Sequence, residues 1–353
     1  MTNPWRFVDA DDDSAADFLA GTIDVLLDLD AWIHPQARFT VREGRCSVQC
    51  DADDDSPLIA LPAEAFLPVG RLHWSDAQDA LAFDLDGAGL TDVQTELLLL
   101  QVAFHNACAK IPRLVADHPV LAGDLSPDVV DAVRAFRPRF RRARPTPTSL
   151  FWSNRTFRLP AGPSAGPEPM ALPLIDLLDH RCGGATGTWT GAAFSVDVSH
   201  AGGEADCWLD YGVQRDAIGM AVVYGFADAS AALAHSAPMD LDVPSLGQVR
   251  VLGRGRTVSG ELLPAAVVRD GDSWVVSHLT VRDAGGELLV RELRDAAGWS
   301  DAQAQEVVAV AAKRNRRLLD AIVAAAAGDG SSAAAVLRDA ALRQGMVLAA
   351  ATR

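Results

Sequence analysis

The side chains best suited to chemistry in this sequence lie in two stretches about thirty residues apart. The first stretch runs from NRTFRLP to PLIDLLDH, and its polar side chains include Arg155, Asp176, Asp179 and His180. The second runs from LDYGVQRD to YGF and carries Tyr211 and Tyr224, the only two tyrosines. Such groups could bind a polar ligand, although aromatic residues taken alone are most simply explained as core packing.

Other catalytic and metal-binding motifs are absent. There is no GxGxxG after a strand, no GxxxxGK[ST], no HExxH and no GxSxG. Eight scattered histidines and five cysteines without a CxxC predict neither a metal site nor a disulfide framework. Cys182 and His180 could form a nucleophile pair, but residues two apart in a turn rarely face each other, so we do not favour it.

Composition limits the class of protein. Of the 353 residues, 49% are hydrophobic and 22% charged, which is typical of a globular protein. The net charge of −16 argues against nucleic acid or an anionic membrane as the main partner. The sequence has no run of about 18 apolar residues, and its N-terminus lacks the features of a secretion signal. We therefore expect a cytoplasmic protein with reduced thiols and about two domains.

One basic segment stands out in this acidic sequence. RPRFRRARP places five arginines in the eight positions from Arg137 to Arg144. The simpler interpretation is a solvated helix end and exit loop, where positive charge suits the helix dipole. The alternative is a contact with an anionic partner, and the sequence leaves both open.

The order of elements predicts an α+β fold. Residues 1–90 are expected to form short strands and turns, and residues 91–148 a helical block. Strand-like segments return over 149–234, and residues 235–353 are expected to hold a β-meander from Gly247 to Arg294 and then helices. Strands and helices in separate blocks favour α+β over a doubly wound sheet.

Several helices have clear end signals. Thr91 begins a capping box, and its helix is predicted to continue to Pro112. Ser126 precedes a helix that stops before Pro138. Ser300 and Gln303 form a second capping box for a long helix ending at Gly328, and a last helix begins at Ser331.

Taken in order, the motifs resemble those of SET-domain methyltransferases, in the branch of the Rubisco large-subunit lysine methyltransferase. The resemblance is sharp over about residues 150–228 and faint in PLIALPAEAFLP near the N-terminus. It implies a SET-like β-fold core from residues 1–90 and 149–234. It further implies a helical insert at 91–148 and a mixed β/helical C-terminal domain at 235–353.

The resemblance implies an S-adenosylmethionine-dependent N-methyltransferase acting on a lysine side chain or a small-molecule amine. Tyr211 would be the catalytic residue. The cofactor contacts would be Arg155, Asp176, Asp179 and His180. The amine channel would be lined by Phe157, Tyr224 and Phe226. Alignment of amine and methyl group supplies much of the rate in such a displacement, and aromatic faces suit an ammonium group.

The sequence departs from the family pattern at three positions. Asp179 replaces the asparagine of an Asn-His pair, and Asp216 replaces an asparagine after the tyrosine strand. Gly44-Arg45-Cys46 places a side chain where the family has the second glycine of Gly-x-Gly. The alternative is therefore a SET-fold protein that has lost methyl transfer and uses its cleft for another small-molecule reaction or for binding.

Overall fold

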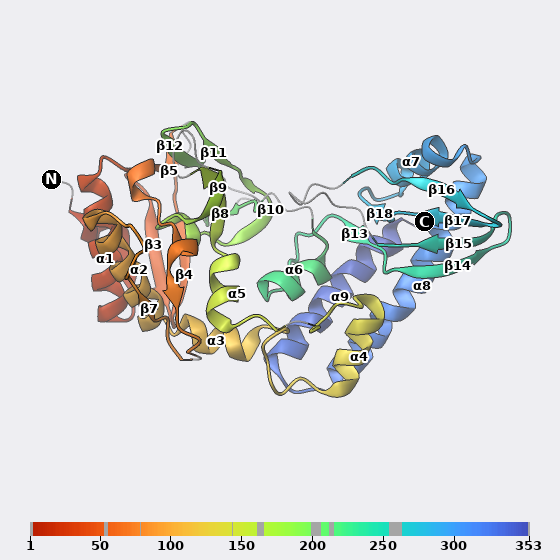
Figure 1. The fold of residues 1–353 in the computed structure, drawn as a ribbon, viewed down its shortest axis with the longest axis horizontal. Coiled ribbons are helices and arrows are strands. Elements are labelled where there is room, and N and C mark those ends of the chain that lie inside the picture. The colour runs from red at the N-terminus through yellow and green to blue at the C-terminus, as the bar shows by residue number, and fades with distance from the viewer. Residues whose placement is uncertain are drawn as a thin grey trace. The chain divides into compact units, whose positions relative to one another are not determined.

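The computed structural model describes residues 3–52, 56–77, 79–142, 144–160, 166–198, 206–211, 215–253 and 263–351 (Figure 1). The chain forms two compact units, and each is built from two segments. Unit 1 comprises Met1–Val115 and Pro145–Gly212, and unit 2 comprises Ala116–Arg144 and Val213–Arg353. Both units contain helices and sheets, which confirms the predicted α+β class. The predicted helical block 91–148 does not belong to a single unit, because its residues 116–144 belong to unit 2 and the rest to unit 1.

Unit 1 is organised around small sheets. A three-stranded sheet has the order β1 (Val8–Ala10), β3 (Arg38–Arg42), β4 (Arg45–Gln49). A four-stranded antiparallel sheet has the order β11 (Gly187–Trp189), β12 (Ala193–Asp197), β5 (Pro57–Pro62), β2 (Trp32–Ile33). Two-stranded pairs are β6 (His73–Trp74) with β7 (Phe83–Asp84) and β8 (Thr156–Pro160) with β9 (Pro167–Ala171). β10 (His180–Ala185) forms isolated bridges to Leu209.

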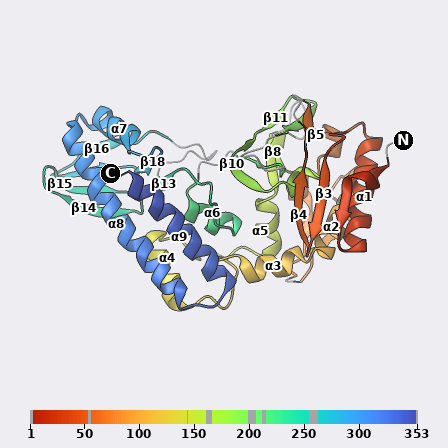
Figure 2. The ribbon, with the colours of Figure 1, turned by 180° about the vertical axis from the view of Figure 1, so that it is seen from behind.

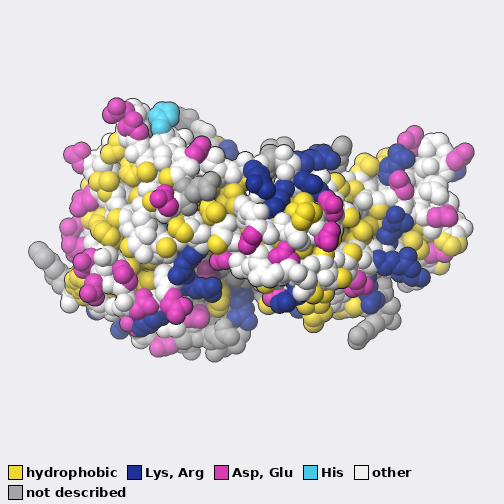
Figure 3. All heavy atoms as spheres, turned by 90° about the horizontal axis from the view of Figure 1, so that it is seen from below, with side chains coloured by type: hydrophobic (Ala, Val, Ile, Leu, Met, Phe, Trp, Pro, Cys, Tyr) yellow, Lys and Arg dark blue, Asp and Glu magenta, His cyan; other side chains and the backbone are white. Residues whose placement is uncertain are grey.

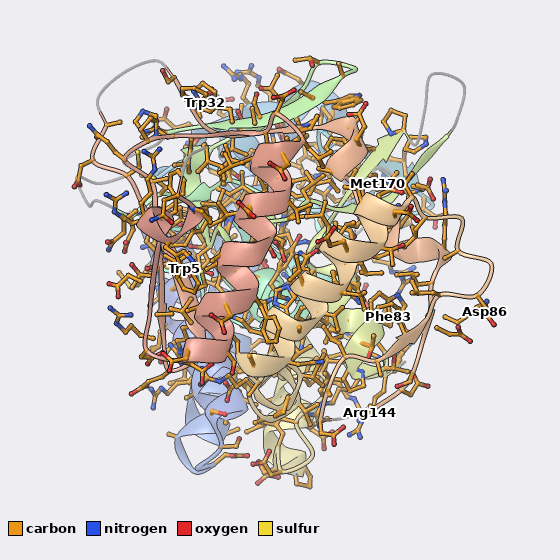
Figure 4. All side chains as sticks on the ribbon, turned by 90° about the vertical axis from the view of Figure 1, so that its left-hand side faces the viewer. Trp5, Trp32, Phe83, Asp86, Arg144 and Met170 are labelled. Carbon is orange, nitrogen blue, oxygen red and sulfur yellow. The ribbon has the colours of Figure 1, made fainter. Side chains whose placement is uncertain are left out.

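Two long helices of unit 1, α1 (Asp13–Asp28) and α2 (Asp92–Ala107), lie side by side (Figure 4). Helix α1 corrects the prediction that residues 1–90 form only strands and turns. Asp12 caps it by accepting a hydrogen bond from the Ala15 amide at 2.8 Å. Leu19, Ile23 and Leu26 repeat at helical spacing and are buried in the core of unit 1.

The predicted capping box at Thr91 is confirmed, but the end of its helix was wrong. Helix α2 ends at Ala107, and Ala109 has a φ of 49°. Helix α3 (Lys110–Asp117) begins next, with Pro112 in its first turn. A proline is tolerated there because its missing N–H has no intrahelical acceptor at that position, so Pro112 did not mark a helix end. The short helix α5 (Pro147–Ser153) leads into β8.

Unit 2 combines a sheet with a layer of helices. The sheet has the order β14 (Met239–Val243), β15 (Gly247–Val251), β17 (Ser273–Val276), β16 (Val267–Asp270). A short pair joins β13 (Ala234–His235) to β18 (Thr280–Val281). The helices are α4 (Pro127–Phe136), α6 (Ala217–Tyr224), α7 (Glu287–Ala297), α8 (Asp301–Ala327) and α9 (Ser332–Ala350). Helices α8 and α9 run side by side, with α4 packed against α8 (Figure 2).

The β-meander predicted from Gly247 to Arg294 was wrong in two respects. β15 pairs with β17 in parallel, so the strands do not follow one another as in a meander. Residues Glu287–Ala297 form α7 instead of a strand, because Leu289 and Leu293 lie four apart and bury one face of a helix. The segment 254–262 lies outside the described residues.

The predicted helix ends in unit 2 are confirmed. Ser126 caps α4, Ser300 and Gln303 form the capping box of α8, and Ser331 caps α9. Gly328 is the C-cap of α8, as expected. Among the described residues, no helix combines the length and hydrophobicity that a membrane span requires.

Candidate functional site

Tyr211 and His180 lie against each other in unit 1. The Tyr211 amide donates a hydrogen bond to His180 Nδ1 at 3.2 Å, and the two ring centroids are 4.7 Å apart. His180 is buried, whereas Tyr211 is half-buried. These two residues, which are 31 positions apart in sequence, are therefore in direct contact.

Backbone pairing explains how two distant segments meet at this point. The Leu209 amide donates to the Asp179 carbonyl at 2.9 Å, and the Asp210 amide to the Ala185 carbonyl at 2.7 Å. These bonds fix the chain leading to Tyr211 alongside β10. The Tyr211 hydroxyl then donates to the Leu178 carbonyl at 3.2 Å. The phenol is thus held by a backbone oxygen close to the start of β10.

Asp179 lies in a cluster of charged groups of both signs. Although its side chain reaches solvent, desolvation by the surrounding protein raises the pKa of Asp179. The nearby charges of Lys110, Arg155 and Arg45 oppose this rise. A carboxylate therefore lies within electrostatic range of three cations, next to His180 and Tyr211.

Arg155 and Lys110 are both partly buried in unit 1. The Arg155 guanidinium lies 4.2 Å from the ring centroid of Phe151, a fully buried residue of α5. Burial lowers the pKa of Lys110, and the charge of Arg155 lowers it further. Sequence reasoning missed Lys110, which is at the first position of α3. Its rarity was a usable signal, because the chain contains only Lys110 and Lys313.

The Gly44-Arg45-Cys46 segment lies at the turn between β3 and β4. Gly44 has a φ of +69°, and a Cβ added there would lie 2.5 Å from the Cys108 carbonyl oxygen. Glycine is therefore required at this position for close backbone packing. Cys46 is buried, and burial raises the pKa of its thiol to about 12. Its side chain fills the interior as an inert, protonated thiol.

Asp176 was predicted to contact the cofactor, and this role stays a prediction. Its side chain is fully buried, and its Oδ2 lies 3.0 Å from His105 Nε2 on α2. Burial lowers the pKa of His105, and Asp176 offsets this only in part. In this arrangement the Asp176 carboxylate is not exposed to solvent. Its position one turn before Asp179 made the two residues look equivalent in sequence.

The three aromatic residues predicted to line an amine channel have packing partners. In unit 1, Phe157 lies on β8 with its ring centroid 5.0 Å from that of Phe194. In unit 2, the centroids of Tyr224 and Phe226 are 6.3 Å apart. The Arg215 guanidinium lies 5.9 Å from the Tyr224 centroid. Their part in an amine channel stays a prediction.

Cys182 and His180 are closer than the sequence suggested. Both belong to β10, so they project from the same face of the strand, and Cys182 Sγ lies 4.0 Å from His180 Nε2. The sequence argument assumed a turn, where such a pair would diverge. None of the five cysteines forms a disulfide.

Comparisons with solved structures show a structural likeness. No protein-family model matches the sequence, and no curated protein matches it. Among solved structures, the chain is similar to the SET domain of LSMT, which was crystallised with lysine and AdoHcy. The match has 12% sequence identity and a TM-score of 0.44, and covers 96% of this chain and 90% of that one. At these values, the assignment of function depends on the residues of the site.

Proposed function

We propose that this chain is an S-adenosylmethionine-dependent N-methyltransferase that acts on a lysine side chain or a small-molecule amine. The observation that carries the proposal is the position of the Tyr211 hydroxyl. It is bonded to the Leu178 carbonyl beside His180, and the neighbouring Asp179 lies within electrostatic range of Lys110, Arg155 and Arg45. The order of motifs around these residues, from NRTFRLP to YGF, supports the same function.

The charges in unit 1 suit the amino-acid end of the proposed cofactor. That end carries a carboxylate and an ammonium group together, so it needs partners of both signs. Arg155 and Lys110 would hold the carboxylate, and Asp179 would accept hydrogen bonds from the ammonium group. His180 would border the same site through its contact with Tyr211. When bound, the cofactor would supply a methyl group on a positively charged sulfur.

Tyr211 contributes orientation. Its hydroxyl donates to the Leu178 carbonyl, and this bond fixes the position of the hydroxyl oxygen. The hydroxyl and the carbonyl place two oxygen atoms about 3 Å apart before any ligand arrives. Preorganised oxygens of this kind stabilise developing charge without reorganising during the reaction. His180 supports the geometry because it fixes the Tyr211 backbone.

Two observations favour a second candidate, a protein that binds a small molecule without methyl transfer. The Cys46 side chain occupies the position that the resembled family leaves to glycine. Asp176 is bonded to His105 in the interior. Both reduce the number of groups available to the cofactor.

Calorimetric titration tests the cofactor assignment. We expect S-adenosylmethionine to bind the unmodified protein, and Arg155→Gln to weaken binding at least about tenfold, because one charge-assisted hydrogen bond is lost. The matched control is Arg71→Gln, which removes an exposed arginine of unit 1 paired with Glu168. Asp179→Asn should retain binding, since the amide keeps an acceptor oxygen. Absence of binding by the unmodified protein would overturn the proposal.

A transfer assay separates the two candidates. The protein is incubated with radiolabelled S-adenosylmethionine and a pool of lysine peptides and small amines. Labelled amine supports the methyltransferase. Binding of the cofactor with no labelled product from any amine supports the second candidate.

A further inference from the structure

An arginine-rich pocket lies within unit 2. It has a volume of about 700 Å³, within the range of small-molecule sites. Its basic wall is made by four arginines: Arg137, Arg139, Arg142 and Arg215. The other walls include His235, Ser236 and Leu252. Every described residue that lines it belongs to unit 2.

The turn after α4 presents these arginines by fixing the residues between them. Phe140 is buried, and its amide donates to the Arg137 carbonyl at 2.9 Å. Arg141 donates to the carbonyl oxygens of Pro119 and Ala122, in the first case at 2.8 Å. These two residues anchor the turn in unit 2. Their neighbours Arg139 and Arg142 line the pocket and are exposed to solvent.

The pocket has an excess of positive charge. Asp216 is the only acidic residue among its described lining residues, and it is already bonded to Arg137. Asp216 also accepts from the amides of Gly219 at 2.7 Å and His235 at 3.0 Å, so it has little capacity left. With the histidines neutral, four arginines against one aspartate leave a surplus of three positive charges. This surplus is unusual in a chain with 47 acidic and 31 basic residues.

Several other arginines with an exposed guanidinium are paired with acidic residues. Arg42 is paired with Asp9, Arg250 with Asp240, and Arg338 with Asp339. Within the described part of the chain, neither Arg139 nor Arg142 has an ion pair. Arg215 Nε is buried and has no hydrogen-bond partner among the described residues. Figure 3 likewise shows Lys and Arg side chains gathered in patches, with Asp and Glu more widely spread.

We propose that this pocket binds a small anion bearing several phosphate or carboxylate groups, held by Arg139, Arg142 and Arg215. Planar guanidinium groups bind such oxyanions through paired hydrogen bonds. Convergence of like charges without acidic partners is unfavourable, and a multiply charged anion would relieve it. Arg137 serves a different purpose, because its bond to Asp216 ties the turn to the start of α6.

Titration with two simple probes tests the pocket and distinguishes the two kinds of group. Pyrophosphate represents the phosphate ligands and citrate the carboxylate ligands, each measured by calorimetry at 25 mM and 200 mM salt. We expect at least one probe to bind with a dissociation constant below about 1 mM and to weaken at higher salt. Tighter binding of pyrophosphate would assign a phosphate ligand, and tighter binding of citrate a carboxylate ligand. Failure of both probes to bind at 25 mM salt overturns the proposal.

Matched double variants show whether binding occurs in the pocket. Arg139→Gln/Arg142→Gln should lower affinity at least about tenfold, since two charge-assisted contacts are lost. The control Arg314→Gln/Arg316→Gln removes the same charge from exposed positions of α8 that do not line the pocket. It should change affinity less than twofold. Equal losses in both variants would indicate attraction by overall charge and contradict the proposal.

Folding of the variants is checked by thermal melting, which should be unchanged because Arg139 and Arg142 make no side-chain bond in the described structure. If the double variant melts early, the single variant Arg142→Glu provides the test. It should lose binding through charge reversal, and retention of affinity would contradict the proposal.

Discussion

Two fully buried aspartates, one in each unit, differ in how completely they are bonded. In unit 2, Asp216 accepts hydrogen bonds from Arg137, from Gln344 at 2.8 Å, and from the amides of Gly219 and His235. In unit 1, Asp176 is bonded through Oδ2 to His105, and its Oδ1 has no partner among the described residues. Buried carboxylates therefore follow two patterns in this chain, one saturated and one with remaining capacity.

This difference indicates a structural role for Asp216 and favours a positioning role for Asp176. Asp216 caps α6 and connects it to β13, α9 and the turn after α4, so its bonds hold several elements of unit 2 together. Asp176 and His105 each keep an unbonded polar atom, as does Gln101 one turn away on α2. Buried polar atoms without a hydrogen bond lower the stability of the fold, so we expect the cluster of Asp176, His105 and Gln101 to serve a purpose other than stability. The cluster lies within electrostatic range of Arg155 and Lys110, which belong to the proposed site.

The largest effect is expected from Asp216→Asn. An amide has one acceptor oxygen, so it cannot satisfy four donors, and Arg137 loses its counter-charge. We expect the free energy of unfolding to fall by about 3–5 kcal/mol, measured by urea denaturation. The control Asp240→Asn, at an exposed pair with Arg250, should cost less than about 1 kcal/mol. Equal losses at the two positions would contradict the structural role of Asp216.

Tyr211→Phe tests the proposed site of unit 1 through its effect on the rate of methyl transfer. The substitution removes one oriented oxygen and keeps the ring against His180. We expect methyl transfer to slow by ~10²–10³ and the free energy of unfolding to fall by only about 1 kcal/mol. Tyr224→Phe should have a milder effect on rate. Full activity of the Tyr211→Phe protein would remove Tyr211 from the catalytic role.

Acid should weaken unit 2 through Asp216. Burial alone would raise the pKa of this group, but the charges of Arg137 and His235 and the hydrogen bonds of Arg137 and Gly219 lower it to about 2. An unfolded aspartate has a pKa of ~3.9. The folded state therefore gains about 2.5 kcal/mol above pH 4, and this gain is lost as pH falls from about 4 to about 2. In urea denaturation at pH 7, 4 and 3, the difference in the free energy of unfolding between the unmodified protein and Asp216→Asn should become smaller as the pH falls. If this difference stays constant with pH, the lowered pKa of Asp216 does not contribute to stability.

Asp176→Asn is expected to have the smallest effect. One acceptor oxygen can still bond to His105 Nε2, so little is lost at the single partner that Asp176 has. We expect a loss of about 1–2 kcal/mol in the free energy of unfolding, well below that of Asp216→Asn. If Asp176→Asn and Asp216→Asn lower the free energy of unfolding by similar amounts, the number of hydrogen bonds that each carboxylate accepts does not determine its contribution to stability. A change in cofactor affinity for Asp176→Asn, with little change in stability, would support a positioning role.

Local signals in the sequence were sufficient for many elements. The side chains of Thr91, Ser126, Ser300 and Ser331 each cap the helix that follows, because capping depends on residues three positions apart. Helix α1 has equally local signals in Asp12 and its apolar face, and the turn-like acidic residues around it obscured them. Helix α7 was missed because glycines precede it and suggested a hairpin turn.

The sequence by itself determined the α+β class, most helix ends and the segments that carry Tyr211 and His180, since each depends on residue type and short spacing. The tertiary structure alone decided which charged groups are accessible. Asp176 and Asp179 are three residues apart, yet one is bonded in the interior and the other reaches solvent. Lys110 comes within electrostatic range of Asp179, and the arginines after α4 share a pocket with Arg215, although the segments in each case are at least 69 residues apart. Burial and pairing depend on such contacts, and no local pattern encodes them.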